Sequence, residues 1–301
     1  MKAIRYEEYG GPEVLKLVEV DTPQPGPQQI RIAVKAAGVN PLDWKLRSGA
    51  FAQVMPTEFP AGVGFEAAGV VDAVGEGVSD VAVGDAVFGP ALAAMAEFAV
   101  LTSWARKPED MPFEVAASLS VATDVANRAL NQIGVKAGET LLVSNAAGGV
   151  GSILVQIARH RGITVIGTAS PQQQDHLRAL GIIPTTFEPG LVERARQLSP
   201  SGYDAALDLI GSGVVPELVE IVGVPSKVLS IVDFAAPQHG AQFLDPTPVD
   251  PTSALSEIAK VHAEGGLRVH VEKTFPLAQL ADAQTLSAGG QVTGKLVITL
   301  D

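Results

Sequence analysis

TLLVSNAAGGVG, residues 140–151, is the stretch that decides the fold of this chain. Leu141, Leu142 and Val143 form a short apolar run that predicts a buried strand, and the glycines after them predict a tight turn. The following residues, SILVQIARHRG, repeat apolar side chains at helical spacing. A buried strand that enters a glycine turn and then a helix is typical of a nucleotide-binding βα unit.

The turn fits the G-x-G-x-x-G pattern, with Ala146 in the first glycine position. The middle glycine, Gly148, lets the backbone approach a pyrophosphate, and the last, Gly151, lets helix and strand pack closely. The helix start adds free N–H donors and the positive end of a dipole. We therefore expect a dinucleotide to contact Ala147, Gly148, Gly149 and Val150. A tight turn without a nucleotide is the alternative. No Lys-Ser or Lys-Thr pair follows the glycines, which argues against the phosphate loop of nucleotide hydrolases.

The end of the second strand, Gly167 to Ser170, indicates which dinucleotide binds. A carboxylate there would accept hydrogen bonds from a free ribose 2′-hydroxyl, but the next acid along the chain is Asp175. Because the hydroxyl of Ser170 tolerates a 2′-phosphate, we predict NADP(H) rather than NAD(H), with Gly167 and Ser170 in the site. The glutamines at 172–174 can hydrogen-bond a phosphate but cannot neutralise it, and the nearest base is Arg178.

Strands alternate with helices after residue 140, which predicts crossover connections and a doubly wound parallel sheet. The fourth strand of this pattern ends at Ile210 and Gly211, and the fifth ends at Ile231 and Val232. Since ligands of open α/β sheets bind beyond the carboxyl ends of strands, these four residues should contact the cofactor. The pattern loosens around residue 241, and DPTPVDPT at 245–252 predicts a loop before a helix near 253–264.

Residues 1–117 consist of short apolar runs separated by Gly and Pro, with little helical period. This pattern predicts a β-rich domain, a partly closed barrel. The tail at 266–301 predicts strand, helix and strand, and its alternating strands resemble those of the first domain. We therefore predict two domains, a β-barrel domain from 1–117 and 266–301 and an α/β domain from 118–265.

Composition excludes several function classes. Acidic residues outnumber basic residues 33 to 21, and the net charge of -12 argues against nucleic-acid and anionic membrane partners. The chain has no cysteine, so disulfides, thiolate metal sites and a cysteine nucleophile are excluded. Its amino terminus has no signal-peptide pattern, so we expect a cytoplasmic protein. The uncharged stretch 140–158 contains serines, Asn145 and Gln156, which favours a buried strand and helix over a membrane span.

The whole chain resembles the medium-chain dehydrogenase/reductase superfamily, in particular its zinc-independent quinone oxidoreductase branch, which includes zeta-crystallin. The matching segments are MKAIRYEEYGGPEVLKLVEV at the start, AAGVNPLDWKLRSG at 36–49, FEAAGVVDAVGEGV at 65–78, VGDAVFG at 83–89, AGETLLVSNAAGGVGSILVQIA at 137–158 and GKLVITL at 294–300. The resemblance implies a GroES-like catalytic domain made from both chain ends, a Rossmann domain between them, and an active-site cleft where the two meet. It also implies a homodimer.

The resemblance also bears on metal binding. Zinc-bearing relatives have a cysteine where this chain has Asn40, and a histidine before a glutamate where this chain has Phe65 before Glu66. They also carry a four-cysteine lobe, which a chain without cysteine cannot form. The five histidines are scattered without ligand spacing. We therefore predict that no zinc takes part in catalysis.

Residues of an NPLDWK loop, including Trp44, are the candidates to line the cleft. Asn40 matches a family asparagine that would donate to the substrate or the cofactor amide; alternatively it holds its own turn. Asp43 is a loop-stabilising carboxylate or an acid. Lys45 replaces a tyrosine that several relatives have near the nicotinamide, so it is a candidate proton donor, with a solvated lysine as the alternative. Thr123 matches a threonine beside the nicotinamide, with a helix-start hydroxyl as the alternative.

Two further residues complete the expected cofactor site. Phe187 stands where many relatives have a tyrosine that contacts the 2′-phosphate, so a hydroxyl is missing there. Lys295, in the tail GKLVITL, could reach the cofactor; a surface lysine is the alternative.

Without a Lewis acid, the remaining chemistry is hydride transfer from the nicotinamide to a carbon polarised by conjugation, in a quinone or an α,β-unsaturated ketone. Hydrogen-bond donors would hold the developing enolate or quinol oxygen, which is then protonated. Two alternatives stay open: an enoyl reductase for polyketide or fatty-acyl thioesters, and a non-catalytic NADPH-binding protein of the crystallin kind. The missing tyrosines at positions 45 and 187 leave room for the latter.

Overall fold

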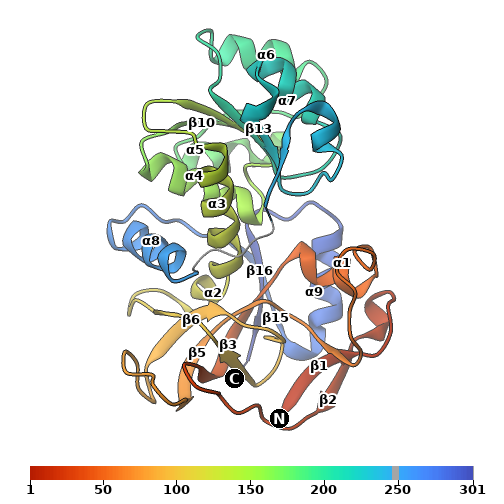
Figure 1. Ribbon diagram of the computed structural model, residues 1–301, viewed down its shortest axis with the longest axis vertical. Coiled ribbons are helices and arrows are strands. Elements are labelled where there is room, and N and C mark those ends of the chain that lie inside the picture. Colours follow the sequence, from red (N-terminus) through yellow and green to blue (C-terminus); the bar gives the residue numbers. More distant parts are fainter. Residues whose placement is uncertain (246–250, 301) are drawn as a thin grey trace. The chain divides into compact units, whose positions relative to one another are not determined.

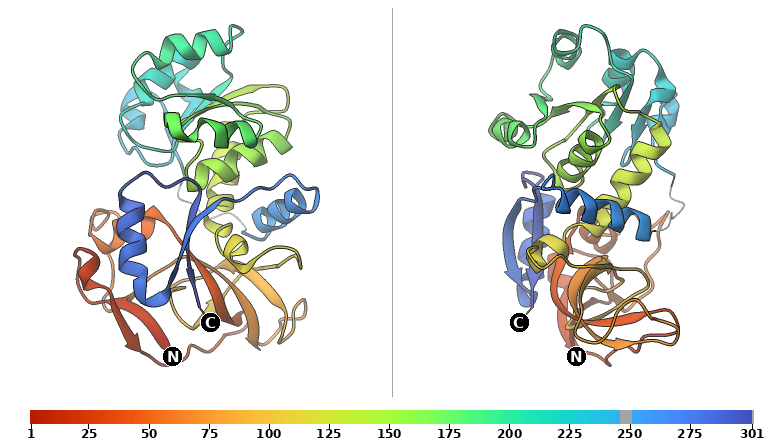
Figure 2. Two further views of the ribbon diagram at one scale, coloured as in Figure 1. Left: turned by 180° about the vertical axis from the view of Figure 1, so that it is seen from behind. Right: turned by 90° about the vertical axis from the view of Figure 1, so that its left-hand side faces the viewer.

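The computed structural model describes residues 1–245 and 251–300, so most of the predicted loop at 245–252 lies outside the described residues. The chain divides into two compact units. Unit 1 contains 1–121, 251–259 and 269–301, and unit 2 contains 122–250 and 260–268. The predicted domain boundaries, 117/118 and 265/266, stay a prediction. They place 251–259 in the α/β domain, whereas the division into units groups this segment with unit 1. Both chain ends belong to unit 1, as Figure 2 shows.

Unit 1 is built mainly from antiparallel strands (Figure 1). Its strands are β1 (Lys2–Tyr6), β2 (Lys16–Glu19), β3 (Ile30–Val39), β4 (Ala61–Gly62), β5 (Glu66–Val74), β6 (Ala86–Pro90), β7 (Phe98–Leu101), β8 (Ala105–Arg106), β15 (Val271–Pro276) and β16 (Lys295–Thr299). Its helices are α1 (Pro41–Arg47), α2 (Phe113–Ala116) and α9 (Leu280–Ala288), with 3-10 turns at Pro12–Val14 and Leu277–Gln279.

Two sheets organise this unit. The smaller has the order β2-β1-β4, and the larger has the order β15-β16-β3-β5-β6-β8, with β7 also paired to β3. Strand β3 alternates buried and half-buried residues over its first six positions, as expected for a strand with one face on the core. Strand β16 pairs antiparallel with β3, bringing Val297 opposite Gly38. Strand β16, near the end of the chain, therefore lies in the same sheet as β3, which comes from its first forty residues.

Unit 2 alternates strands and helices. Its strands are β9 (Thr140–Val143), β10 (Thr164–Thr168), β11 (Ile183–Thr185), β12 (Ala205–Asp208), β13 (Val228–Ser230) and β14 (Gln242–Phe243). Its helices are α4 (Gly149–His160), α5 (Gln174–Ala179), α6 (Leu191–Leu198) and α7 (Val215–Val222), with 3-10 turns at Pro171–Gln173, Pro225–Lys227 and Ala236–His239. Helices α3 (Ser120–Ile133) and α8 (Pro251–Ala263) each contain residues of both units.

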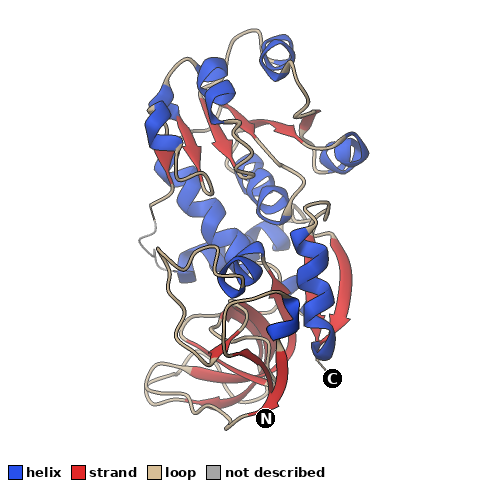
Figure 3. Ribbon diagram, turned by 90° about the vertical axis from the view of Figure 1, so that its right-hand side faces the viewer, coloured by secondary structure: helices blue, strands red, loops and turns tan. Residues whose placement is uncertain are grey.

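The sheet of unit 2 is parallel throughout, in the order β11-β10-β9-β12-β13-β14. Helices flank it on both sides (Figure 3). Its strands read as continuous apolar runs because both faces are covered: Leu141, Leu142 and Val143 are all fully buried. The doubly wound parallel sheet predicted from the sequence is thus confirmed. Strand β14 was not predicted, because two residues are too few for a periodic pattern.

Among the helices that the structure describes, none is long and apolar enough to cross a membrane.

Candidate functional site

The glycine turn between β9 and α4 is held by the neighbouring strand β10. Asn145 opens the turn with a left-handed φ of 54°, which asparagine adopts more readily than most residues. Its N–H donates to Thr168 Oγ1 at 3.1 Å, and the N–H of Ala146 donates to the carbonyl of Thr168 at 2.9 Å. A Cβ on Gly151 would lie 2.2 Å from the carbonyl oxygen of Asn145. Only glycine therefore fits where α4 passes the turn.

The first turn of α4 offers unpaired N–H donors. Gly148 is the N-cap and makes no side-chain capping bond, and the residues of this first turn, all of them described, include no acid. The N–H groups at a helix start have no acceptor within the helix, and together with the dipole they attract an anion. The predicted contacts at Ala147, Gly148, Gly149 and Val150 are brought together here, at a site suited to a phosphate group.

The end of β10 is a closed hydrogen-bonded turn. Ser170 Oγ donates to Gln173 Oε1 at 3.0 Å, and the N–H of Ser170 contacts the same oxygen at 3.2 Å. Gln174 Nε2 donates to the carbonyls of Ala169, Ser170 and Thr185 at 3.0 to 3.1 Å. Gln174 could therefore bond a phosphate, as the sequence suggested, only by breaking these contacts.

The other side chains predicted around the 2′-position are differently placed. Phe187 is half exposed in the loop between β11 and α6. Arg194, which the sequence did not single out, holds this loop by donating to the carbonyls of Thr186 at 3.1 Å and Pro189 at 2.8 Å. Arg178 is exposed and pairs with Asp175 at 2.5 Å. The residues at the end of β10, from Gly167 to Ser170, include no carboxylate.

The four residues predicted beyond β12 and β13 lie in two neighbouring loops. Gly211 has a left-handed φ of 72°, and a Cβ on it would lie 3.0 Å from Val232 Cγ2. Ile210 is 41% exposed, and Ile231 is half-buried. Asp208, fully buried at the end of β12, accepts hydrogen bonds from the first of these loops and was missed at the sequence level.

Thr123 lies in α3 and is fully buried. Its Oγ1 has no hydrogen-bond partner within residues 1–245 and 251–300. A buried hydroxyl is rarely left unpaired, but this oxygen is closed to solvent, so a ligand could bond it only after neighbouring groups move.

A buried polar network joins the start of α1 to β5 and β16 in unit 1. Asn40 Nδ2 donates to Glu66 Oε1 at 2.8 Å, and Lys295 Nζ donates to Asn40 Oδ1 at 2.8 Å and to Glu66 Oε1 at 2.9 Å. The N–H of Val121 donates to Glu66 Oε2 at 2.8 Å. A Cβ on Gly38 would lie 2.3 Å from Glu66 Oε1, so glycine makes room for the carboxylate. We call these contacts the Glu66 network.

The Glu66 network engages two predicted site residues. Both ends of the Asn40 amide are bonded within it, and Lys295 is only 3% exposed. A direct contact of either side chain with substrate or cofactor therefore stays a prediction. Such a contact would have to replace these hydrogen bonds. The sequence could not reveal the network, since Lys295 and Glu66 are 229 residues apart.

The NPLDWK segment was predicted as a loop, and that prediction is wrong: it forms helix α1. Asn40 is the N-cap, Pro41 occupies the first turn, and Asp43 Oδ2 accepts a hydrogen bond from the N–H of Asn40 at 2.7 Å. Asp43 Oδ1 is buried and has no partner among the described residues. Burial raises the pKa of Asp43 to about 7.

Lys45 lies between two aromatic rings. Its Nζ is 5.6 Å from the ring centroids of both Trp44 and Phe51. In the part of the chain that the structure describes it forms no ion pair, and burial lowers its pKa. A lysine of this kind releases its proton more readily than a solvated one.

Metal ligands are not grouped in the described ranges. Within residues 1–245 and 251–300 there is no set of three or more His, Cys, Asp or Glu side chains that could hold a metal ion.

Two family models match the chain. Residues 26–105 match the alcohol dehydrogenase GroES-like domain, and residues 184–298 match the zinc-binding dehydrogenase family. The first match falls in unit 1, and it confirms the GroES-like domain predicted from the sequence.

Individual proteins resemble the chain over its full length. The NADPH-dependent alkenal/one oxidoreductase of Arabidopsis thaliana chloroplasts is 32% identical over 316 aligned residues, which cover 99% of this chain and 79% of that protein. The solved quinone oxidoreductase of Coxiella burnetii is 31% identical with a TM-score of 0.88, covering 100% of this chain and 99% of the other. A mycobacterial protein solved in complex with NADPH is 29% identical with a TM-score of 0.87, covering all of both chains.

Proposed function

The chain belongs to the medium-chain dehydrogenase/reductase superfamily, in which it groups with quinone oxidoreductases, and on this premise we propose that it is an NADPH-dependent reductase of quinones or α,β-unsaturated carbonyl compounds. The observation that carries the proposal is the start of α4, where a glycine turn presents free N–H donors beside a strand end without a carboxylate. NADPH is named for a similar plant enzyme and is bound in a similar mycobacterial structure.

The residues of unit 2 fit a phosphorylated dinucleotide. The N–H groups at 149–151 would hold the pyrophosphate, and the unpaired hydroxyl of Thr123 would bond a polar group of the nicotinamide. The end of β10 has no acid that would repel a 2′-phosphate. When bound there, NADPH supplies a hydride to the substrate.

Lys45 is our candidate for the residue that protonates the substrate oxygen. It has a proton to give, an aromatic surrounding that can accept a flat conjugated substrate, and a pKa lowered by burial. Asn40 and Asp43 support this role indirectly, because they form the start of the helix that carries Lys45. The amide of Asn40 bonds Glu66 and Lys295, and only its backbone N–H bonds Asp43 within the turn.

Steady-state assays of NADPH oxidation test the proposal. We expect turnover with some members of a panel of quinones, 2-alkenals and conjugated ketones. Turnover of acyl thioesters alone would favour the enoyl reductase alternative. Tight binding of NADPH without turnover of any acceptor would refute the proposed enzymatic activity and favour a crystallin-like NADPH-binding protein.

Three finer properties are part of the proposal. We propose that catalysis needs no zinc, because the zinc-ligand positions of relatives hold Asn40 and Phe65 here. Activity that survives dialysis against a chelator, in protein free of zinc by elemental analysis, tests this. We further propose a homodimer in the cytoplasm, to be checked by light scattering and by cell fractionation.

A further inference from the structure

Asp208 ends strand β12 with its carboxylate fully buried among hydrogen-bond donors. Oδ1 accepts from Ser144 Oγ at 3.0 Å and from the N–H groups of Ile210 at 3.0 Å and Gly211 at 3.1 Å. Oδ2 accepts from Ser230 Oγ at 2.7 Å. We call these contacts the Asp208 network.

The two serines fix the polarity of the Asp208 network. Ser230 Oγ accepts from the N–H groups of Val232 at 3.2 Å and Asp233 at 2.8 Å, so both of its lone pairs are used. Its proton must therefore point at Asp208. Ser144 Oγ likewise accepts from the N–H of Leu209 at 2.9 Å. Two hydroxyls and two backbone N–H groups thus face Asp208, and a carboxylate has enough acceptor sites for all four.

The Asp208 network lies where the strand order of unit 2 reverses. The chain runs outward from β9 through β10 to β11 and then returns to place β12 on the other side of β9. In open α/β sheets the ligand binds at the carboxyl ends of strands at such a reversal. Ser144, Asp208 and Ser230 follow or end β9, β12 and β13, so one carboxylate links three adjacent strand ends.

The loops attached to the Asp208 network are those predicted to face the cofactor. Its donors include N–H groups of the 209–211 loop directly, and those of the 231–233 loop through Ser230. Sheets of this kind consist of two mononucleotide-binding halves. The half formed by β12 to β14 lies away from β10, whose end would receive the adenosine ribose of the proposed cofactor. The 209–211 and 231–233 loops therefore belong to the nicotinamide half.

We propose that Asp208 is a positioning residue for the nicotinamide half of the bound dinucleotide, an inference that rests on the proposed function. Its charge holds the 209–211 and 231–233 loops in the shape that receives the nicotinamide nucleotide, while the adenosine half binds independently of it. Asp208 does not touch the ligand itself.

The test is the substitution D208N, which keeps the size of the side chain but points an amide donor at other donors. NADPH and 2′,5′-ADP, which carries only the adenosine half, are titrated against wild type and variant by calorimetry. We expect the Kd for NADPH to rise at least about tenfold and the Kd for 2′,5′-ADP to stay unchanged. Hydrogen–deuterium exchange of the ligand-free variant should accelerate at 209–211 and 231–233.

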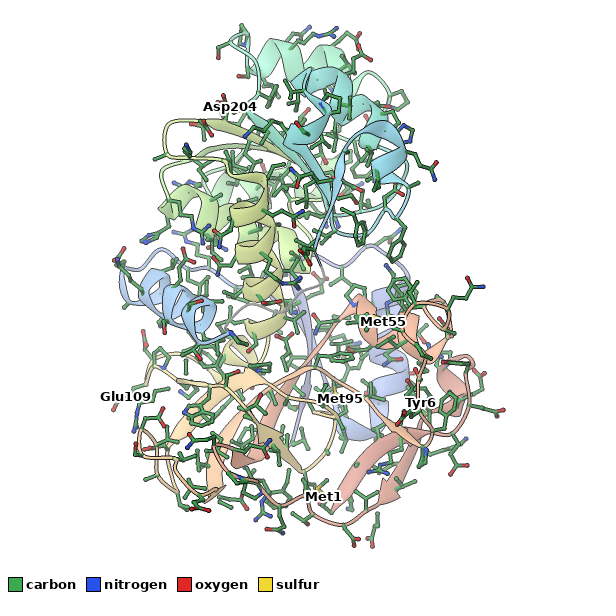
Figure 4. The ribbon with its side chains drawn as sticks, in the orientation of Figure 1. Met1, Tyr6, Met55, Met95, Glu109 and Asp204 are labelled. Atoms are coloured by element: carbon green, nitrogen blue, oxygen red, sulfur yellow. The ribbon has the colours of Figure 1, made fainter. Side chains whose placement is uncertain are left out.

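The matched control is D204N. Asp204, labelled in Figure 4, precedes the other end of β12, is exposed, and accepts a hydrogen bond from the N–H of Thr140 at 2.8 Å. This variant should bind both nucleotides as wild type does. S230A is the second variant, for the case that D208N does not fold. It removes only the hydrogen bonds of the Ser230 hydroxyl, which connect Asp208 to the 231–233 loop. It should weaken the binding of NADPH and leave the binding of 2′,5′-ADP unchanged.

The two proposals fail in different ways. Suppose that wild type binds both nucleotides. If D208N and S230A then lower the affinity for NADPH and for 2′,5′-ADP equally, or lower neither affinity, Asp208 has only a general structural role and the inference is overturned. If wild type binds neither nucleotide, the proposed function itself is refuted and the inference falls with it.

Discussion

Replacing Asp43 by asparagine should stabilise unit 1 at alkaline pH. Burial raises the pKa of this carboxyl from 3.8 to about 7; the negative charge of Glu66 adds to the rise, while the N–H of Asn40 and the ammonium of Lys295 oppose it. Between about pH 4 and pH 7 the folded protein therefore holds a proton that the unfolded chain has released. Stability falls as pH rises through this window and stays low above it.

The size of the effect follows from the shift. A shift of about 3 pKa units corresponds to about 4 kcal/mol of the free energy of unfolding. The D43N variant has no titrating group, retains a side-chain oxygen for the N–H of Asn40, and loses none of this stability. Wild type and variant should be similar near pH 4, and the variant should be more stable by up to this amount at pH 8.

Urea unfolding followed by tryptophan fluorescence measures the difference. Both tryptophans, Trp44 and Trp104, belong to unit 1, so the signal reports this unit alone. The control is D85N, because hydrogen bonds from Ala82 and Arg106 lower the pKa of Asp85. Its carboxylate is ionised across this range, so D85N should differ from wild type by a constant amount between pH 5 and pH 8. Parallel pH profiles for D43N and wild type would refute the reasoning.

Three further predictions concern the proposed reaction. The G151A variant places a methyl group 2.2 Å from a backbone oxygen, so the turn must shift and the Kd for NADPH should rise at least about tenfold in calorimetry; wild-type affinity would contradict the packing argument. K45M should lower kcat by about a hundredfold and remove the loss of activity at high pH, while the Kd for NADPH is unchanged; K45R, which does not release its proton, should not restore kcat. S170D should weaken NADPH at least about tenfold and leave NADH unaffected, because a carboxylate repels the 2′-phosphate; equal affinities in wild type would already contradict the assignment.

The features that the sequence predicted well are those decided by near neighbours. The turn at 145–151 depends on Asn145, Gly148 and Gly151, which lie within one strand-turn-helix unit. The alternation of strands and helices in unit 2 is equally local, so the parallel sheet could be predicted. Helix α1 was mistaken for a loop because it has seven residues, too few for a helical period, and its capping by Asp43 depends on a single bond.

The features that the sequence missed depend on sheet register. Ser144 and Asp208 are 64 residues apart, and they meet because β9 and β12 pair with Leu207 opposite Val143. Lys295 reaches Glu66 only because β16 pairs with β3 and β3 with β5. No short-range sequence pattern predicts either of these two contacts. The sequence around a buried polar residue at a strand end does not reveal which residue it will hydrogen-bond.

Three carboxylates are buried among the residues that the structure describes, and they differ in the donors that surround them. This difference predicts how each tolerates substitution. Glu66 has an ammonium, an amide and a backbone N–H, and Asp208 has two hydroxyls and two backbone N–H groups. Asp43 has one N–H and, within the described residues, an unpaired oxygen, which is why burial prevails and raises its pKa. Loss of the negative charge thus leaves hydrogen-bond donors without an acceptor around Glu66 and Asp208. At Asp43 it removes the cost of burying a charge. The same change from carboxylate to amide should therefore stabilise the protein at Asp43 and disable the loops at Asp208.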